Sequence, residues 1–110
     1  MDMKIEKSGE ITLLKCAGSL DADNVAFFRK KTGDLFDGGA SKFVIDAAGL
    51  SFVDSMGLGA MISLMRRASE RKGDVKIVNL TNEVKEIFDI TRLNKLFDVC
   101  ISCEAACKKF

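Results

Sequence analysis

The 110-residue sequence contains no histidine, no proline, no tryptophan and no tyrosine. Without histidine, neither a Ser/His/Asp triad nor a Cys/His pair can form, and the usual general base near neutral pH is missing. No pair of carboxylates stands out as a catalytic constellation either. The composition therefore predicts a protein that is not an enzyme and that uses no cofactor.

The sequence also has no long apolar run and no strong excess of either charge. No stretch approaches the roughly 18 apolar residues of a membrane span, and the N-terminal MDMKIEK lacks the apolar core of a signal peptide. Lys plus Arg number 17 against 16 for Asp plus Glu, so the net charge of +1 attracts neither nucleic acid nor anionic membranes. We expect one cytoplasmic domain over residues 1–110, a monomer when free, with no nucleic-acid binding and no direct membrane contact.

Three of the four cysteines lie close together near the C-terminus. Cys100, Cys103 and Cys107 have the spacing C-x-x-C-x-x-x-C, which leaves a metal or iron-sulfur protein as an alternative. Structural zinc takes four ligands, however, and no histidine is present to help. We therefore predict no metal site: Cys100 closes a strand, while the other two are small apolar groups on one face of a terminal helix. In the cytoplasm we expect no disulfide.

The stretch that organises the chain runs from Phe43 to Gly59, FVIDAAGLSFVDSMGLG. The apolar run ending at Asp46 predicts a strand that is buried on both faces. A loop is expected next, at 47–49, held to the core by Leu50, Phe52 and Val53. Apolar residues then recur every three to four positions, which predicts a helix; they are Leu58, Met61, Ile62, Met65 and Ala68.

The start of that helix carries the candidate functional residues. Ser55 is the expected N-cap, with its hydroxyl near the unpaired amides of the first turn. Gly57 and Gly59 follow within that turn, although glycine costs about 1 kcal/mol relative to alanine inside a helix. Two such residues indicate a close approach, either by another part of the backbone or by a partner. On the local pattern alone, we favour the simpler interpretation, a capped helix packed tightly on a sheet.

The remaining pattern alternates strands and helices after an opening hairpin. Strands are predicted at 2–7 and 11–17, joined by a turn at Ser8-Gly9, with the second strand inside the sheet. A helix capped by Asp21 or Asp23 follows and stops at Gly38-Gly39. Its buried face is expected to carry Val25, Phe28, Leu35 and Phe36.

The second half of the chain continues the alternation. The second helix should end near Lys72, with Gly73 just past its last turn, and a strand should follow at 75–79. Thr81 is the expected cap of a third helix, before a last strand at 97–101 and a short helix at 102–109. The resulting order, β-β-α-β-α-β-α-β-α, predicts an α/β fold with a mixed, mostly parallel sheet and helices packed against it. The loops at 18–21, 47–55 and 79–81 all follow strands and should converge at one edge.

Several of these stretches resemble one family. FVDSMGLG resembles the D-S-[ST]-G-L-G signature of the STAS domain, and the chain as a whole resembles the bacterial anti-sigma factor antagonists. The resemblance covers nearly all 110 residues. The other segments that resemble the family are Gly18-Ser19-Leu20-Asp21, which is similar to its G-x-[LIV]-D pattern, then Phe43 to Asp46, Val75 to Asn79, Leu93 to Phe97, and Glu104-Ala105.

The resemblance implies a phosphorylation switch. In that family the serine after the aspartate is phosphorylated by the anti-sigma factor, which is itself a serine kinase, and Ser55 is the matching position. The unphosphorylated protein would bind that kinase and so release its sigma factor, and a serine phosphatase would remove the phosphate. The implied partner-binding residues are Asp21, Asp54, Ser55, Met56, Gly57, Leu58 and Gly59.

The sequence departs from the family pattern at two positions. Met56 stands where the family often has serine or threonine, which removes a hydroxyl from the contact. Arg92 stands where the resemblance leads us to expect glycine before Leu93, so the third helix either ends differently or runs on to Asn94. Because STAS domains also serve as accessory modules of lipid transporters, in signalling scaffolds or as nucleotide-binding modules, a role without phospho-switching stays open.

Overall fold

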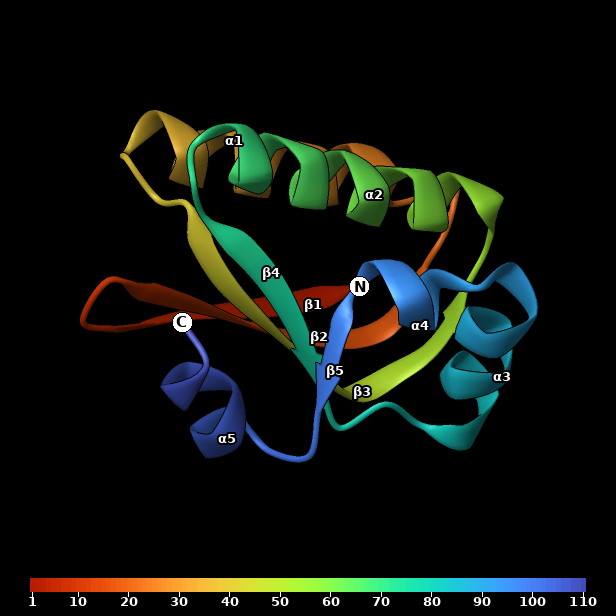
Figure 1. Cartoon of the computed structure of the whole chain (residues 1–110). Coiled ribbons are helices and arrows are strands. Elements are labelled where there is room, and N and C mark those ends of the chain that lie inside the picture. The colour runs from red at the N-terminus through yellow and green to blue at the C-terminus, as the bar shows by residue number, and fades with distance from the viewer.

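The computed structural model describes residues 1–110 and consists of one five-stranded sheet with five helices packed around it (Figure 1). The elements are β1 (Asp2–Ser8), β2 (Ile11–Leu20), α1 (Val25–Asp37), β3 (Lys42–Val53), α2 (Ser55–Glu70), β4 (Asp74–Val78), α3 (Asn82–Thr91), α4 (Leu93–Leu96), β5 (Asp98–Cys100) and α5 (Cys103–Lys108). The predicted order is confirmed, except that the short helix α4 was not expected.

The sheet is mixed and mostly parallel, as predicted. Its strands lie in sequence order, with β1 antiparallel to β2 and all other neighbours parallel. The prediction that the second strand lies inside the sheet is therefore confirmed. Parallel neighbours need a crossover, and α1, α2 and the pair α3–α4 supply the three crossovers.

Two apolar clusters hold the helices to the sheet. In Figure 1, α1 and α2 lie side by side on one face, and α5 lies on the opposite side. The larger cluster joins the sheet to α1, α2 and α3 through buried residues such as Ile45, Phe28, Met61 and Phe88. The smaller cluster places Val44 with Val78, Cys100 and Ala106 beneath α5. Because successive strand residues face opposite sides, Val44 and Ile45 bury both faces of β3, as the apolar run predicted.

The expected loop at 47–49 is wrong, because β3 continues through it to Val53. The extended part pairs with β2, with register shifts around Ala17 and Gly18 that allow the strand to bend. Gly49 approaches Ala17 so closely that an added Cβ would lie 3.0 Å from the Ala17 Cβ atom. The prediction that Phe52 holds this segment to the core is also wrong, because Phe52 is 50% exposed, while Leu50 and Val53 are buried.

Several helix ends differ from the prediction. Neither Asp21 nor Asp23 caps α1, whose N-cap residue is Asn24. The residue with positive φ after α2 is Lys72 and not Gly73, whose place is set by its close packing on the Ser41 carbonyl group. The third helix ends at Thr91, because Arg92 adopts the left-handed conformation with φ 61°. That is the conformation for which glycine is the usual residue.

The predicted cap of the third helix is confirmed. The Thr81 hydroxyl accepts a hydrogen bond from the Val84 amide at 3.4 Å, and α3 begins at the next residue after this cap. The last strand and helix are shorter than expected, with Ser102 as the N-cap of α5.

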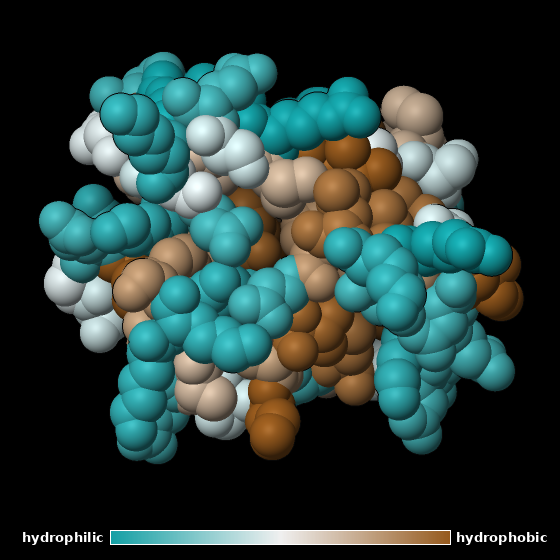
Figure 2. Space-filling model, in the orientation of Figure 1, coloured by the Kyte–Doolittle hydropathy of each residue, from teal (hydrophilic) through white to brown (hydrophobic).

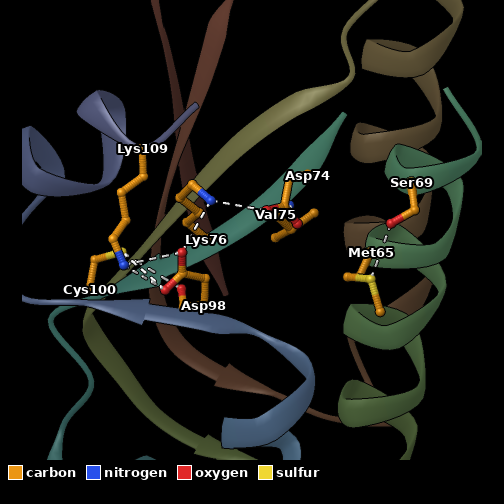
Figure 3. Close-up of polar contacts among 8 residues, drawn as sticks. All are labelled: Met65, Ser69, Asp74, Val75, Lys76, Asp98, Cys100 and Lys109. Carbon is orange, nitrogen blue, oxygen red and sulfur yellow. Dashed lines mark hydrogen bonds and ion pairs between the residues drawn. The ribbon is translucent and has the colours of Figure 1, made fainter. Parts of the chain in front are cut away.

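A buried lysine ties the C-terminal segment to the sheet (Figure 3). The Lys76 side chain on β4 is 5% exposed and pairs with Asp74 at 3.0 Å and Asp98 at 3.2 Å. Burial alone would lower the pKa of Lys76, but hydrogen bonds to both carboxylates outweigh burial and raise it. Lys109 also pairs with Asp98 at 3.2 Å, and the Phe110 ring lies 4.7 Å from the Lys76 ammonium group. These contacts join β4, β5 and the end of the chain.

The cysteines are all free thiols, and Cys100 is buried at the end of β5, as predicted. Cys103 and Cys107 are half-buried and pack against the smaller apolar cluster. No group of three or more cysteine, aspartate or glutamate side chains is arranged to hold a metal ion. None of the helices has both the length and the apolar character needed to cross a bilayer.

The edge of the sheet at β5 is more apolar than the sequence pattern indicated. Leu96, Val99 and Ile101 are exposed on and beside this strand. Figure 2 shows an apolar area across the middle of the face on which β5 lies, bordered by hydrophilic side chains. The monomeric state of the free protein stays a prediction.

Candidate functional site

The site lies where β2 and β3 end beside each other. Leu20 and Val53, the last residues of the two strands, are partners in the parallel ladder. The Asp54 amide then donates to the Leu20 carbonyl oxygen at 3.1 Å, which keeps the backbone extended up to the first residue of α2. The segment after β2 and the start of α2 are therefore held together at one end of the sheet.

Asp54, and not Ser55, is the N-cap of α2, so that prediction is wrong. One carboxylate oxygen of Asp54 accepts from the Gly57 amide at 2.9 Å, and the other accepts from the Ala22 amide at 3.0 Å. A carboxylate caps a helix as well as a hydroxyl does, and its charge also favours the positive end of the helix dipole. The hydrogen bond from Gly57 is the main reason why the pKa of Asp54 is lowered, with burial opposing it and the amides of Ala22 and Met56 adding to it.

Ser55 is consequently the first residue of α2 and is exposed. Its hydroxyl makes no hydrogen bond within the chain, because Asp54 already occupies the amide that a capping serine would bind. A hydroxyl that is exposed and unbonded at a helix start is open to a modifying enzyme.

Asp21 lies at the same sheet end as Ser55. Its carboxylate accepts from the Ser19 hydroxyl at 2.9 Å and from the Asp23 amide at 3.0 Å, which shapes the loop between β2 and α1. The bond from Ala22 to Asp54 joins this loop to the start of α2.

The third predicted loop does not join the site. Asn79 donates to Asp46 at 3.1 Å and Thr81 donates to the Leu50 carbonyl oxygen at 3.1 Å, so the 79–81 segment lies alongside the middle of β3. The convergence of all three loops was expected because β3 was predicted to end at Asp46. Since β3 runs on to Val53, only two of the loops meet at Ser55.

The two glycines of the first turn have different surroundings. A Cβ atom added to Gly57 would overlap the Leu20 carbonyl oxygen and come within 2.9 Å of side-chain atoms of Leu20 and Val53. Gly57 therefore allows α2 to start directly against the end of β2, which confirms the close backbone approach. Gly59 has no atom within 4 Å of its added Cβ, so no contact inside the chain requires a glycine there.

Two half-exposed apolar side chains flank Ser55 in the sequence. Met56 is 51% exposed and Phe52 is 50% exposed, whereas Leu58 is partly buried against the core. Sequence reasoning missed Phe52 as a surface residue. Strand alternation gave no such signal, because it puts Phe52 on the same side as the buried Leu50; the register shift between the pairs Gly18–Leu50 and Ser19–Phe52 separates the two side chains. Phosphorylation of Ser55 remains a prediction, and so do all the expected partner contacts, which are Asp21, Asp54, Ser55, Met56, Gly57, Leu58 and Gly59.

The site can accept a group on the Ser55 hydroxyl and can present a mixed apolar and acidic surface. Both carboxylates at this end, Asp21 and Asp54, accept hydrogen bonds from the chain itself and thereby shape the backbone. A group attached to the Ser55 hydroxyl would therefore break no hydrogen bond of the chain.

The mixed five-stranded sheet with helices packed around it places the chain among the small α/β domains. Residues 2–106 match the family model of the STAS domain, and the chain belongs to this family. One relative is the anti-sigma-B factor antagonist of Bacillus subtilis (strain 168), which is 30% identical over 88 residues, or 80% of each protein.

Two solved structures illustrate the shared fold. An anti-sigma factor antagonist from Mycobacterium paratuberculosis has a TM-score of 0.87 at 17% identity, over 98% of this chain and 92% of that one. The Bacillus cell fate determinant SpoIIAA in its phosphorylated form has a TM-score of 0.76 at 22% identity, over 99% of this chain and 100% of that one. The Bacillus subtilis relative and the Mycobacterium paratuberculosis structure are both named as anti-sigma factor antagonists.

Proposed function

We propose that this protein is a cytoplasmic anti-sigma factor antagonist whose binding to an anti-sigma factor with serine-kinase activity is switched off by phosphorylation of Ser55. The observation that carries the proposal is the exposed, unbonded hydroxyl of Ser55 beside the carboxylate of Asp54 at the start of α2. Family membership and the named relatives support it. A serine phosphatase restores the binding form.

The unphosphorylated surface suits a close protein contact. Phe52 and Met56 are each about half exposed, and covering them would remove apolar area from water. Because fully burying such a side chain contributes about 1.5 to 3 kcal/mol, each would contribute about 1 kcal/mol. Gly59 leaves room for the partner to approach the helix backbone, since nothing within the chain fills the space above it.

Phosphorylation would change this surface by adding charge to it. A phosphoryl group adds about −1.5 to −2 charges. The helix start already carries the Asp54 carboxylate, which occupies the Gly57 amide, so two anions would lie on adjacent residues. An uncompensated charge at an interface costs about 2 to 5 kcal/mol, which corresponds to a weakening of about 30-fold to several thousandfold.

The first test is to incubate the protein with the anti-sigma factor and ATP and to measure its intact mass. One added phosphoryl group is expected. Trypsin leaves Ser51, Ser55 and Ser63 in one peptide, so fragmentation within that peptide must locate the phosphate. The Ser51 hydroxyl donates to the Gly18 carbonyl oxygen at 3.1 Å and the Ser63 hydroxyl donates to that of Gly59 at 3.0 Å, which favours Ser55 as the acceptor.

Matched variants make the test specific. Ser55→Ala should abolish phosphorylation but keep partner binding, whereas Ser51→Ala, a few residues away, should be phosphorylated like the natural protein. Ser55→Glu should weaken binding of the anti-sigma factor by at least tenfold in calorimetry. Phosphate found on Ser51 or Ser63, or a Ser55→Glu protein that binds with unchanged affinity, would refute the proposal.

A further inference from the structure

A second site lies at the other end of the sheet. There, between the β1–β2 hairpin and the ends of α1 and α2, the surface has a groove of about 390 Å³. In Figure 1 this end is on the left, whereas α2 starts on the right. The residues that line the groove are Lys7, Gly9, Glu10, Thr12, Gly38, Gly39, Ala40, Ser41, Lys42, Arg71 and Lys72.

The groove concentrates positive charge in a chain that is nearly neutral. Four of its side chains are cationic and only Glu10 is anionic, although the whole chain has a net charge of only +1. We propose that this groove binds a small phosphate-bearing anion. This site is separate from Ser55, and the proposal goes beyond the antagonist function.

The second observation is an unpaired hydroxyl in the floor of the groove. Thr12 on β2 is only 2% exposed and lines the groove, and its hydroxyl has no hydrogen-bond partner within the chain. Thr32, which is also buried, donates its hydroxyl to the Phe28 carbonyl oxygen at 3.0 Å. No buried side-chain oxygen or nitrogen of the chain lacks a hydrogen-bond partner, so the unpaired Thr12 hydroxyl is reached from the groove and is free to donate to a ligand there. Lys7 is the ladder partner of Thr12, so both side chains face the groove from the same side of the sheet.

The walls of the groove are fixed by contacts inside the chain. The Ala40 amide donates to the Leu35 carbonyl oxygen at 3.0 Å, and the Asp74 amide donates to that of Ser41 at 3.1 Å. Arg71 donates to the Phe36 carbonyl oxygen and stacks on its ring at 5.1 Å, and yet remains exposed. A site whose donors are already in position loses little conformational freedom on binding.

The lining selects the kind of ligand. Ala40 is the one hydrophobic residue among the eleven, so the groove offers no apolar surface for a nucleobase. Its volume lies at the small end of the range for ligand pockets, which is about 300 to 1,000 Å³. Both properties favour a compact anion such as a diphosphate or a sugar phosphate. Lys42 is already paired with Glu10 at 2.9 Å, so the ligand must compete with that carboxylate, and binding should weaken as salt is added.

The competing explanation is that the cations serve only the fold. Arg71 and Lys72 follow the last turn of α2, where positive charge offsets the negative end of the helix dipole. Lys7 lies on a strand and cannot serve this purpose, and neither can the Thr12 hydroxyl. These two residues therefore separate the explanations.

The test is a titration of the full chain with inorganic diphosphate at constant ionic strength, monitored by calorimetry and by amide chemical shifts. We expect saturable shifts at Thr12, Gly39 and Ser41. Thr12→Val removes only the hydroxyl, so it should leave stability unchanged or higher while weakening diphosphate binding about tenfold, the loss expected for one hydrogen bond to a charged group. Lys7→Gln should also weaken binding. Lys4, which is also exposed, lies three residues earlier on the opposite face of β1, and Lys4→Gln should not weaken binding.

The proposal fails if diphosphate produces no larger heats or amide shifts than chloride at the same ionic strength. It also fails if Thr12→Val binds diphosphate like the natural protein, or if both lysine variants lose affinity equally. The Ser55→Glu protein should bind diphosphate with unchanged affinity. A failure of the antagonist proposal would therefore be distinguishable from a failure of this one.

Discussion

Alanine at the two glycines of the first turn of α2 should change stability in opposite directions. In both Gly57→Ala and Gly59→Ala, removing a helical glycine contributes about 1 kcal/mol in favour of folding. At Gly59 the new methyl group meets no atom within 4 Å, so this gain should be fully realised. At Gly57 the methyl group overlaps the Leu20 carbonyl oxygen, which the sheet holds in place, and such overpacking costs about 1 to 3 kcal/mol.

The two variants should therefore differ by about 1 to 3 kcal/mol, with Gly59→Ala the more stable. The chain has no tryptophan or tyrosine, so far-ultraviolet circular dichroism is the appropriate signal for urea and thermal unfolding. A gain of about 1 kcal/mol corresponds to a rise in Tm of about 4 °C for a domain of this size. Gly33→Ala in α1 is the matched control, because its added Cβ would have an ordinary contact at 3.8 Å with Arg67.

The two control comparisons decide what the glycines do. Gly33→Ala and Gly59→Ala should gain similar stability, while only Gly59→Ala should lose affinity for the anti-sigma factor, because its methyl group would stand between the helix and the partner. A Gly57→Ala protein at least as stable as the natural one would refute the close approach of α2 to β2 as the reason for that glycine. A Gly59→Ala protein with full partner affinity would remove Gly59 from the proposed surface.

Three further predictions test the fold. Arg92→Gly should raise the free energy of unfolding in urea by about 1 kcal/mol, because Arg92 has φ 61°, a conformation that glycine adopts more easily than residues with a Cβ. Arg92→Ala, which keeps a Cβ, should give no such gain. Burial alone would raise the pKa of Asp98, but hydrogen bonds from Lys76 and Lys109 lower it. The stabilisation that the Asp98 carboxylate gives the fold is therefore present above the ordinary aspartate pKa and is lost as pH falls through the lowered value. Asp98→Asn should flatten this part of a plot of unfolding free energy against pH. Burial raises the pKa of Cys16 to about 12, so mass-spectrometric mapping of alkylation at pH 8 should show Cys16 modified last.

The layout of the sheet could be predicted from the sequence, but the length of its central strand could not. The apolar run at 43–45 shows that β3 is buried on both faces, and the structure agrees. The next residues, Ala47, Ala48 and Gly49, belong to types that are depleted in strands. They are extended because β2 pairs on both sides of the two alanines, at Asp46 and from Gly49 onward, and such a pairing between distant segments leaves no local signal. The helix α4 was missed for a similar reason, since it has only four residues and follows a left-handed arginine.

At the candidate site, the position of the serine could be predicted but its structural role could not. Asp54 and Ser55 are adjacent, and both residue types cap helices well, so the sequence leaves the helix start uncertain by one residue. The tertiary structure decides the matter. The hydrogen bond from the Asp54 amide to Leu20 keeps Asp54 extended, with φ −91° and ψ −176°, and the first helical residue is therefore Ser55.

This one-residue difference determines how a modification at Ser55 would act. If Ser55 were the cap, a phosphate would replace the group that binds the amide of Gly57. With Asp54 as the cap, α2 keeps that hydrogen bond in both states, and the fold tolerates the modification. A phosphate on Ser55 would instead add negative charge beside the Asp54 carboxylate, which also accepts a hydrogen bond from the Ala22 amide of the loop that contains Asp21. Because this carboxylate already serves as the cap, the added charge would act mainly on the partner, by repelling it from the proposed surface.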